Sequence, residues 1–255
     1  MLILEGDARN GRIDRRLACT LALVAGALNS AGFYAVGFFS ANMTGNVSIL
    51  ADHVALGDLL RGLFYLAIVA TFVVGALVST LLISVGRRRS MAGIYAVSIV
   101  AEAVLLTGLG CADLLLPDGE RGPILIFGLS FLMGLQNAVV TRISNARVRT
   151  THISGMATDI GIELGTLVDH AWRRGPPEEA MPVLEKLRLH AATVLSFCLG
   201  GVGGVVAYKA FGSGLLFGAA AVLFAVALPG LMKLWGRGSG GPAGRSTYDP
   251  RVVEP

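Results

Sequence analysis

Six long apolar runs constrain this chain more than any other feature of its sequence. They lie at about 17–40, 62–86, 91–116, 123–141, 189–208 and 213–235. Each approaches or exceeds the roughly 20 apolar residues that cross a hydrocarbon core about 30 Å thick. A hydrophobic fraction of 54% with only 15% charged residues also lies outside the range of a soluble domain. The sequence therefore predicts an all-α integral membrane protein with about six transmembrane helices.

Two further segments, 42–56 and 154–172, are only partly apolar, and whether they cross the membrane decides the topology. If neither crosses, 18 of the 21 basic residues lie on the cytoplasmic side, whereas only 14 do so if both cross. Because Lys and Arg concentrate in cytoplasmic loops, six spans are favoured, with both termini in the cytoplasm. We expect a cytoplasmic segment at 1–16, a membrane domain at 17–235 and a disordered cytoplasmic tail at 236–255.

Composition also narrows the function classes. Cys19, Cys111 and Cys198 fall inside predicted spans, and their spacing matches neither a metal site nor a disulfide framework. The net charge of +4 comes from basic residues that flank the spans, so it reports on membrane orientation rather than on nucleic-acid binding. We therefore expect no metal, no cofactor and no nucleic-acid partner.

The two halves of the membrane domain share three matches in the same order. Gly26-Ala-Leu-Asn29 in the first span corresponds to Gly134-Leu-Gln-Asn137 in the fourth. Just after those spans, motif one (42–48, Asn-Met-Thr-Gly-Asn-Val-Ser) corresponds to motif two (152–158, His-Ile-Ser-Gly-Met-Ala-Thr). Around the second and fifth spans, Arg61 and Phe72-x-x-Gly75 correspond to Lys186 and Phe197-x-x-Gly200. Each match alone is weak, but together they predict an internal repeat at 17–116 and 123–235.

The number of spans in each repeat unit decides how the two copies are oriented in the membrane. Each unit contains three spans, so the second copy enters the membrane from the opposite side and the chain becomes a 3+3 inverted repeat. Motif one is then expected on the outer side and motif two on the inner side, each followed by a broken, re-entrant or interfacial helix. Inverted repeats with interrupted helices are common in secondary transporters, where the halves supply two openings to one site.

Each motif combines a hydroxyl residue and a glycine ahead of a short helix. Thr44 and Ser154 are residue types that cap helix N-termini, and short helices are expected at 47–56 and 157–172. If these helices dip into the membrane, their first N–H groups and positive dipole ends favour a small anion or carboxylate. The alternative is an ordinary capped loop leading to an amphipathic helix at the membrane surface.

Polar side chains deep in the spans are the other candidates. Asn29 and Asn137 must be hydrogen-bonded or hydrated, and they could pin the two repeats together or contact a solute. Glu102, near the middle of the third span, is a candidate for carrying a coupling proton, although a purely structural role is the alternative. The substrate or pore candidates are Asn29, Asn42, Thr44, Gly45, Asn46, Ser48, Asn137, Thr151, His152, Ser154, Gly155, Thr158 and Asp159.

An enzyme is disfavoured. His152 and Ser154 resemble a fragment of an intramembrane serine protease site, but residues two apart on a helix point to different faces. The sequence contains neither a Gly-x-Ser-Gly elbow nor a metal-binding histidine pair, and no nucleotide-binding loop of an ATP-driven pump. The remaining alternative to transport is a non-transporting membrane protein, such as an assembly or sensor component or an intramembrane enzyme.

At these motifs the chain resembles the YoaK family of bacterial multi-pass membrane proteins. The resemblance rests on Asn42-Met-Thr-Gly-Asn46, on Gly134-Leu-Gln-Asn137 and on Thr150-Thr-His152-Ile-Ser-Gly155 with Thr158-Asp159, and it extends over roughly 15–235. It implies a bacterial inner-membrane location but no activity. From the residues we expect a small-solute transporter or channel, with the lipid bilayer and a small polar or anionic solute as partners and a homo-oligomer as its assembly.

Overall fold

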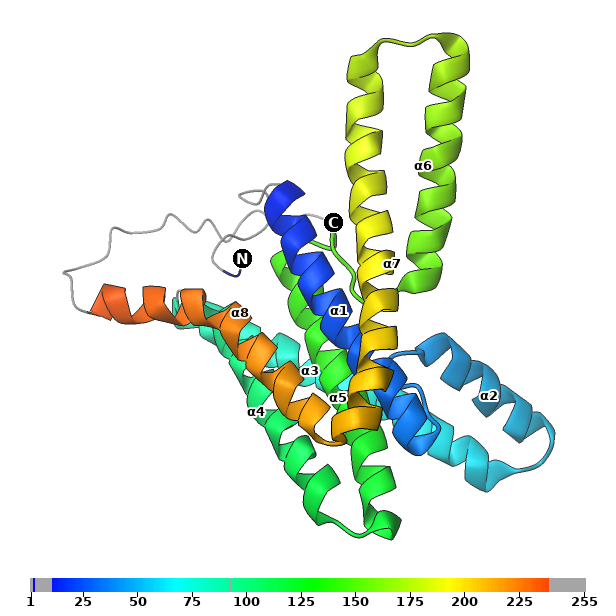
Figure 1. Ribbon diagram of the computed structural model, residues 1–255, viewed down its shortest axis with the longest axis vertical. Helices are drawn as coiled ribbons and strands as arrows, with labels where there is room; N and C mark the ends of the chain where they lie inside the picture. The colour runs from blue at the N-terminus through cyan, green and yellow to red at the C-terminus, as the bar shows by residue number, and fades with distance from the viewer. Residues whose placement is uncertain (1, 3–10, 92, 239–255) are drawn as a thin grey trace.

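The computed structural model describes residues 2, 11–91 and 93–238, and this part of the chain is all-helical (Figure 1). The helices of the described residues are α1 (Gly11–Val36), α2 (Met43–Ala55), α3 (Leu59–Arg88), α4 (Ile94–Leu115), α5 (Asp118–Ile143), α6 (Ile153–Arg173), α7 (Pro177–Phe211) and α8 (Gly214–Gly238). The tail predicted to be disordered begins at 236, and its residues beyond Gly238 lie outside the described residues.

Six of these helices are long and apolar enough to cross a membrane, which confirms the predicted number of spans. They are α1, α3, α4, α5, α7 and α8. The two semi-apolar segments form α2 and α6, which are not among them. Both are longer than expected, because each already begins inside its motif.

Helix pairs organise the bundle. α1 packs along α7, α3 along α5 and α4 along α8, while α2 lies against α3 and α6 against α7. α1 also contacts α5, and these two helices are the most buried of the spans. The side chains in the core include Leu28, Ile99, Met133 and Leu223, all at most 1% exposed.

Glycines allow the closest of these approaches. A side chain at Gly26 of α1 would collide with the backbone carbonyl of Phe197 on α7. A side chain at Gly134 of α5 would collide in the same way with the carbonyl of Phe72 on α3. Small residues let the backbones of membrane helices come together and pack by van der Waals contact.

The fifth span is longer than predicted. α7 has 35 residues, or about 52 Å at 1.5 Å per residue, which exceeds a hydrocarbon core of about 30 Å. It begins at Pro177, a residue suited to a first helical turn, and its first half carries Lys186 and Arg188. The hairpin of α6 and α7 projects well beyond the rest of the bundle (Figure 1). Hydropathy missed this part of the helix because charged residues interrupt it.

Candidate functional site

Two loops fold back into the bundle instead of staying at its ends. α1 ends before Gly37, whose φ of +77° suits glycine, and the backbone N–H of Ala41 donates to Asn29 Oδ1 at 2.9 Å. Asn29 lies seven residues before the last residue of α1, so Ala41 is held about 10 Å inside that end of the helix. The loop of 37–42 therefore folds back beside α1.

The second loop is held by the equivalent amide. Thr151 Oγ1 donates to Asn137 Oδ1 at 2.9 Å, and Asn137 Nδ2 donates to the carbonyl of Met133 at 2.7 Å. Each asparagine therefore binds the loop that follows its own helix. The alternative in which Asn29 and Asn137 pin the two halves to each other is not what these contacts show.

The capping residues differ from the prediction. α2 and α6 are capped by Asn42 and His152, not by Thr44 and Ser154, which lie in the first turn of each helix. Asn42 Oδ1 accepts from the backbone N–H of Gly45 at 3.1 Å, whereas His152 makes no side-chain capping hydrogen bond. The helices begin earlier than expected because the polar residue that opens each motif already has a cap conformation.

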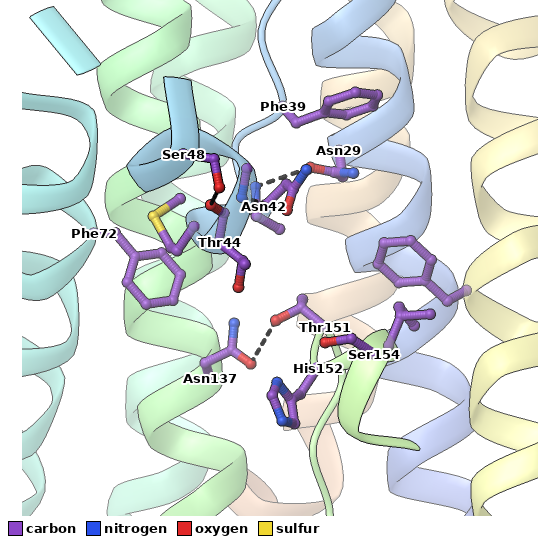
Figure 2. Close-up of a pocket in the computed structure, with 15 residues that line it drawn as sticks. Asn29, Phe39, Asn42, Thr44, Ser48, Phe72, Asn137, Thr151, His152 and Ser154 are labelled. Atoms are coloured by element: carbon purple, nitrogen blue, oxygen red, sulfur yellow. Dashed lines mark hydrogen bonds between the residues drawn. The ribbon is translucent and has the colours of Figure 1, made fainter. Parts of the chain in front are cut away.

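The starts of α2 and α6 meet at one cavity of about 710 Å³ (Figure 2). Nine of the predicted candidates line it, namely Asn29, Asn42, Thr44, Gly45, Ser48, Asn137, Thr151, His152 and Ser154. In Figure 2, Asn42, Thr44 and Ser48 border it from one side, and Thr151, His152 and Ser154 from the other. The structure thus brings together residues more than a hundred positions apart in the sequence.

Four candidates lie elsewhere. Asn46 is buried, and its Nδ2 donates to the carbonyl of Phe39 at 3.3 Å. Thr158 Oγ1 donates back to the carbonyl of Ser154 at 3.2 Å, and Gly155 lies under the ring of His152. Asp159 borders a separate cavity of about 220 Å³ with Arg147, Arg149 and His190.

The sequence analysis missed the aromatic part of the central cavity. Phe39, Phe72 and Phe197 line it together with Ala41, Met43 and Ile153. A signal for two of them was present, because Phe72 and Phe197 are the matched phenylalanines of the repeat. In the sequence, this match indicated only how the two halves align. Apolar walls with a few convergent polar groups are usual for small-molecule sites.

The surroundings of the cavity differ between its two sides. A second cavity of about 580 Å³ shares Phe72 and Asn137 with the first and is bordered by Arg87 and Arg142 near the ends of α3 and α5. Toward the other side, Phe39 stacks on Phe33 with ring centroids 4.1 Å apart. The central cavity therefore adjoins a basic vestibule on one side and an aromatic stack on the other.

Glu102 does not reach the central cavity, but it has a partner that sequence could not name. Gln136 Nε2 donates to Glu102 Oε1 at 2.9 Å, and both side chains are 0% exposed. Glu102 Oε2 has no hydrogen-bond partner among the described residues. Gln136 directly precedes Asn137 on α5, and Asn137 lines the cavity. The carboxyl group of Glu102 is therefore hydrogen-bonded to the neighbour of a cavity-lining residue.

Other ionisable side chains tie the helices together at a distance from the central cavity. Asp113 Oδ1 lies 3.4 Å from Arg121 Nε and accepts from the hydroxyl of Tyr208 at 3.0 Å, linking α4, α5 and α7. Glu163 Oε1 lies 2.9 Å from His190 Nδ1, between α6 and α7. Within the described part of the chain, no group of three or more His, Cys, Asp or Glu side chains could hold a metal ion.

Comparison with known proteins agrees with this architecture. The chain is 23% identical over 223 residues to the UPF0700 transmembrane protein YoaK of Bacillus subtilis (strain 168), and the match covers 86% of this chain and 95% of that protein. No solved structure matches. The family model described as "Protein of unknown function (DUF1275)" matches residues 17–228, the whole region that builds the cavity. The chain is therefore a multi-pass membrane protein that belongs to the DUF1275 family.

Proposed function

We propose that the chain carries a small anion or carboxylate across the membrane, as a secondary transporter or channel, with the solute bound between motif one and motif two. The observation that carries the proposal is the cavity of about 710 Å³ at which α2 and α6 both begin. The N-terminus of a helix presents backbone N–H groups and the positive end of its dipole. Two such ends directed at one cavity favour a negative charge between them.

The side chains of the cavity fit the same ligand class. Thr44 and Ser154 bring hydroxyl groups to it, whereas the hydroxyl of Ser48 donates to the carbonyl of Thr44. His152 leaves the first turn of α6 without a side-chain cap. Hydroxyl and backbone N–H donors can replace the water around a small anion without fixing a permanent counter-charge. A neutral set of donors also allows release, which a transporter requires.

We further propose that the fold is a 3+3 inverted repeat of α1–α4 and α5–α8. The helix contacts support it, because exchanging the halves turns the α1–α7 pair into the α5–α3 pair and α2–α3 into α6–α7. The glycine contacts exchange as well. Gly26 against Phe197 corresponds to Gly134 against Phe72. Since each unit holds three spans, the copies have opposite orientations in the membrane.

The motifs support the repeat at the level of single residues. The ten positions from Ala41 and the ten from Thr151 follow the same order of buried, half-buried and exposed side chains. Asn29 and Asn137 each accept a hydrogen bond from the residue just before a motif, Ala41 and Thr151 respectively. Local packing therefore repeats although the residue types differ.

Unequal access fits a transporter in one of two states. The side with Arg87 and Arg142 adjoins the cavity, whereas Phe33 and Phe39 stack on the other side. In an inverted repeat, the halves can exchange these roles and so open the second side. The excess of Lys and Arg supports a cytoplasmic position for the basic vestibule. Arginines at that mouth would raise the local concentration of anions.

Proton coupling is the finer part of the proposal and rests on Glu102. Its carboxyl group accepts from Gln136, the residue before Asn137, so a change in its charge would act on the helix that lines the cavity. An ionisable group at this depth of a span is a candidate for carrying a proton. A flux that depends on a proton gradient, and loses this dependence in Glu102→Gln, is the expected signature.

The experiment is a flux assay with purified protein in liposomes. Small carboxylates, inorganic anions and amines are supplied as labelled solutes, and the same set is screened by thermal stabilisation in detergent. The test variants are Thr44→Val and Ser154→Ala, which remove hydroxyl groups from the cavity. Thr107→Val on α4 is the matched control, because its hydroxyl donates to the carbonyl of Ala103 and lines none of the cavities described above.

We expect flux of at least one anion or carboxylate, reduced in both test variants and unchanged in Thr107→Val. Flux of amines alone would refute the anion class. If no solute is carried or stabilises the protein, and Asn42→Ala and His152→Ala leave the phenotype of the cell unchanged, transport is refuted in favour of a non-transporting membrane protein.

A further inference from the structure

α2 and α6 each carry a stripe of hydroxyl and small residues on their outward side, beside exposed apolar side chains such as Val54 and Ile162. Each helix uses its other face to pack on a single neighbour, α2 on α3 and α6 on α7. The stripe on α2 consists of Thr44, Ser48, Ala51 and Ala55, all exposed and spaced by helical turns. The stripe on α6 consists of Ser154, Thr158, Gly161 and Gly165, also exposed, and Trp172, 83% exposed, continues it toward the end of the helix. In both helices two hydroxyl residues are followed by two small residues.

Other exposed faces of the bundle differ sharply from this one. Val73, Leu77 and Leu81 on α3 are 58%, 53% and 55% exposed. Leu199 and Val202 on α7 are 58% and 63% exposed. Long apolar side chains of this kind are suited to lipid tails. The hydroxyl and small faces of α2 and α6 are instead typical of surfaces on which another membrane helix packs closely.

Lipid is a poor occupant of this face for a second reason. The central cavity lies where α2 and α6 begin, and Asn29 holds the adjoining loop about 10 Å inside the end of α1. Asn42 and His152 are exposed at this level, beside backbone that is not helical. Irregular backbone and polar side chains at membrane depth are tolerated only where protein or a water-filled cavity covers them.

We propose that a second copy of this chain packs on this face and covers Thr44, Ser48 and Ser154, which line the cavity and are exposed. Around a two-fold axis normal to the membrane, α2 packs on α2 of the partner in one leaflet and α6 on α6 of the partner in the other. A symmetric dimer brings the same patch of both copies together, so each stripe meets its own copy across the axis. The proposed packing of the two copies depends on the composition of the face alone. Only the identification of the cavity as a solute site rests on the proposed function.

The available area suffices for a stable pair. α2 and α6 have 13 and 21 residues, hence about 20 and 31 Å of helix. A contact strip about 10 Å wide along both helices covers roughly 500 Å² per copy. The pair then buries about 1,000 Å², the lower bound for a specific interface. Ala51, Ala55, Gly161 and Gly165 let the backbones approach closely enough to use it.

Cysteine cross-linking in native membranes tests the pairing. In a background in which Cys19, Cys111 and Cys198 are replaced by alanine, Ala51→Cys and Gly161→Cys are oxidised with copper phenanthroline. The matched controls are Val73→Cys and Val202→Cys, which lie on the apolar faces of α3 and α7. We expect a shift to the covalent dimer for Ala51→Cys and Gly161→Cys, and none for the controls. Cross-linking only at the controls, or at no position, would overturn the proposal.

A second measurement covers the case in which a new cysteine disturbs folding. The mass of the purified protein in detergent is compared between Gly161→Leu and Gly108→Leu, since a side chain at either glycine meets nothing within 4 Å. Loss of the dimer in Gly161→Leu alone supports the interface, and a monomeric unmodified protein refutes it. The result is separable from the flux assay: a dimer without flux refutes transport, and a monomer with flux refutes the dimer.

Discussion

Replacing Gly134 by alanine should destabilise the bundle, because the added methyl group meets backbone and not a flexible side chain. The position that it would take is occupied by the carbonyl group of Phe72, and the backbone N of Ala76 lies 3.1 Å away. α3 and α5 must then move apart. Overpacking of this kind costs about 1–3 kcal/mol, or roughly 2–12 °C in Tm for a chain of this size.

The proposed internal repeat extends this prediction to a second position. Gly26→Ala should destabilise the protein by a similar amount, since its methyl group meets the carbonyl of Phe197 on α7. Gly108→Ala and Gly218→Ala are the controls, because a side chain at either position meets nothing within 4 Å. Alanine is favoured over glycine in a helix by up to about 1 kcal/mol, so the controls should be neutral or slightly stabilising.

Thermal unfolding of the four variants in one detergent, followed by intrinsic fluorescence, measures the effect. Both test variants should melt below the unmodified protein, and both controls at or above it. If Gly26→Ala and Gly134→Ala melt with the controls, the close helix approaches described here are wrong. If only one of them is destabilised, the equivalence of the two helix pairs fails.

Three further predictions follow from the polar contacts. Asn29→Ala should cost about 1–3 kcal/mol, because the loop N–H bound to it loses its acceptor; the melting temperature in detergent measures this. Gln136→Leu should cost a similar amount by leaving the buried Glu102 without its donor, and the double variant with Glu102→Leu should recover stability in the same assay. Impermeant thiol reagents should label Leu56→Cys and Glu178→Cys from opposite sides of the membrane, and labelling from one side would refute the inverted repeat.

The spans were predictable because they depend on local composition. An apolar run of sufficient length must cross the membrane, and charge fixed how many runs do so. The ends of the helices were less predictable. α1 stops at Val36, short of the end of its apolar run, because Gly37 turns the chain back with a positive φ. α7 starts before its apolar run because a helix outside the hydrocarbon needs no apolar residues.

The candidate site was predictable in its residue types and not in its contacts. Motif one and motif two are local patterns, and the proposed repeat relates one to the other. That they border one cavity depends on α1 packing on α7 and α3 on α5, which no periodicity encodes. The Glu102–Gln136 contact was missed for the same reason, since it joins two helices through single side chains.

A small rotation at the cavity would produce a larger displacement at the far end of the α6–α7 hairpin. α6 begins at the cavity and runs as one helix to Arg173, a length of about 31 Å. A tilt of about 10° at its first turn would move the far end by about 5 Å, since a helix transmits rotation as a stiff rod. A spectroscopic label near Gly175 would therefore report small movements at His152 and Ser154. The position of the hairpin's far end would thus report on the state of the cavity.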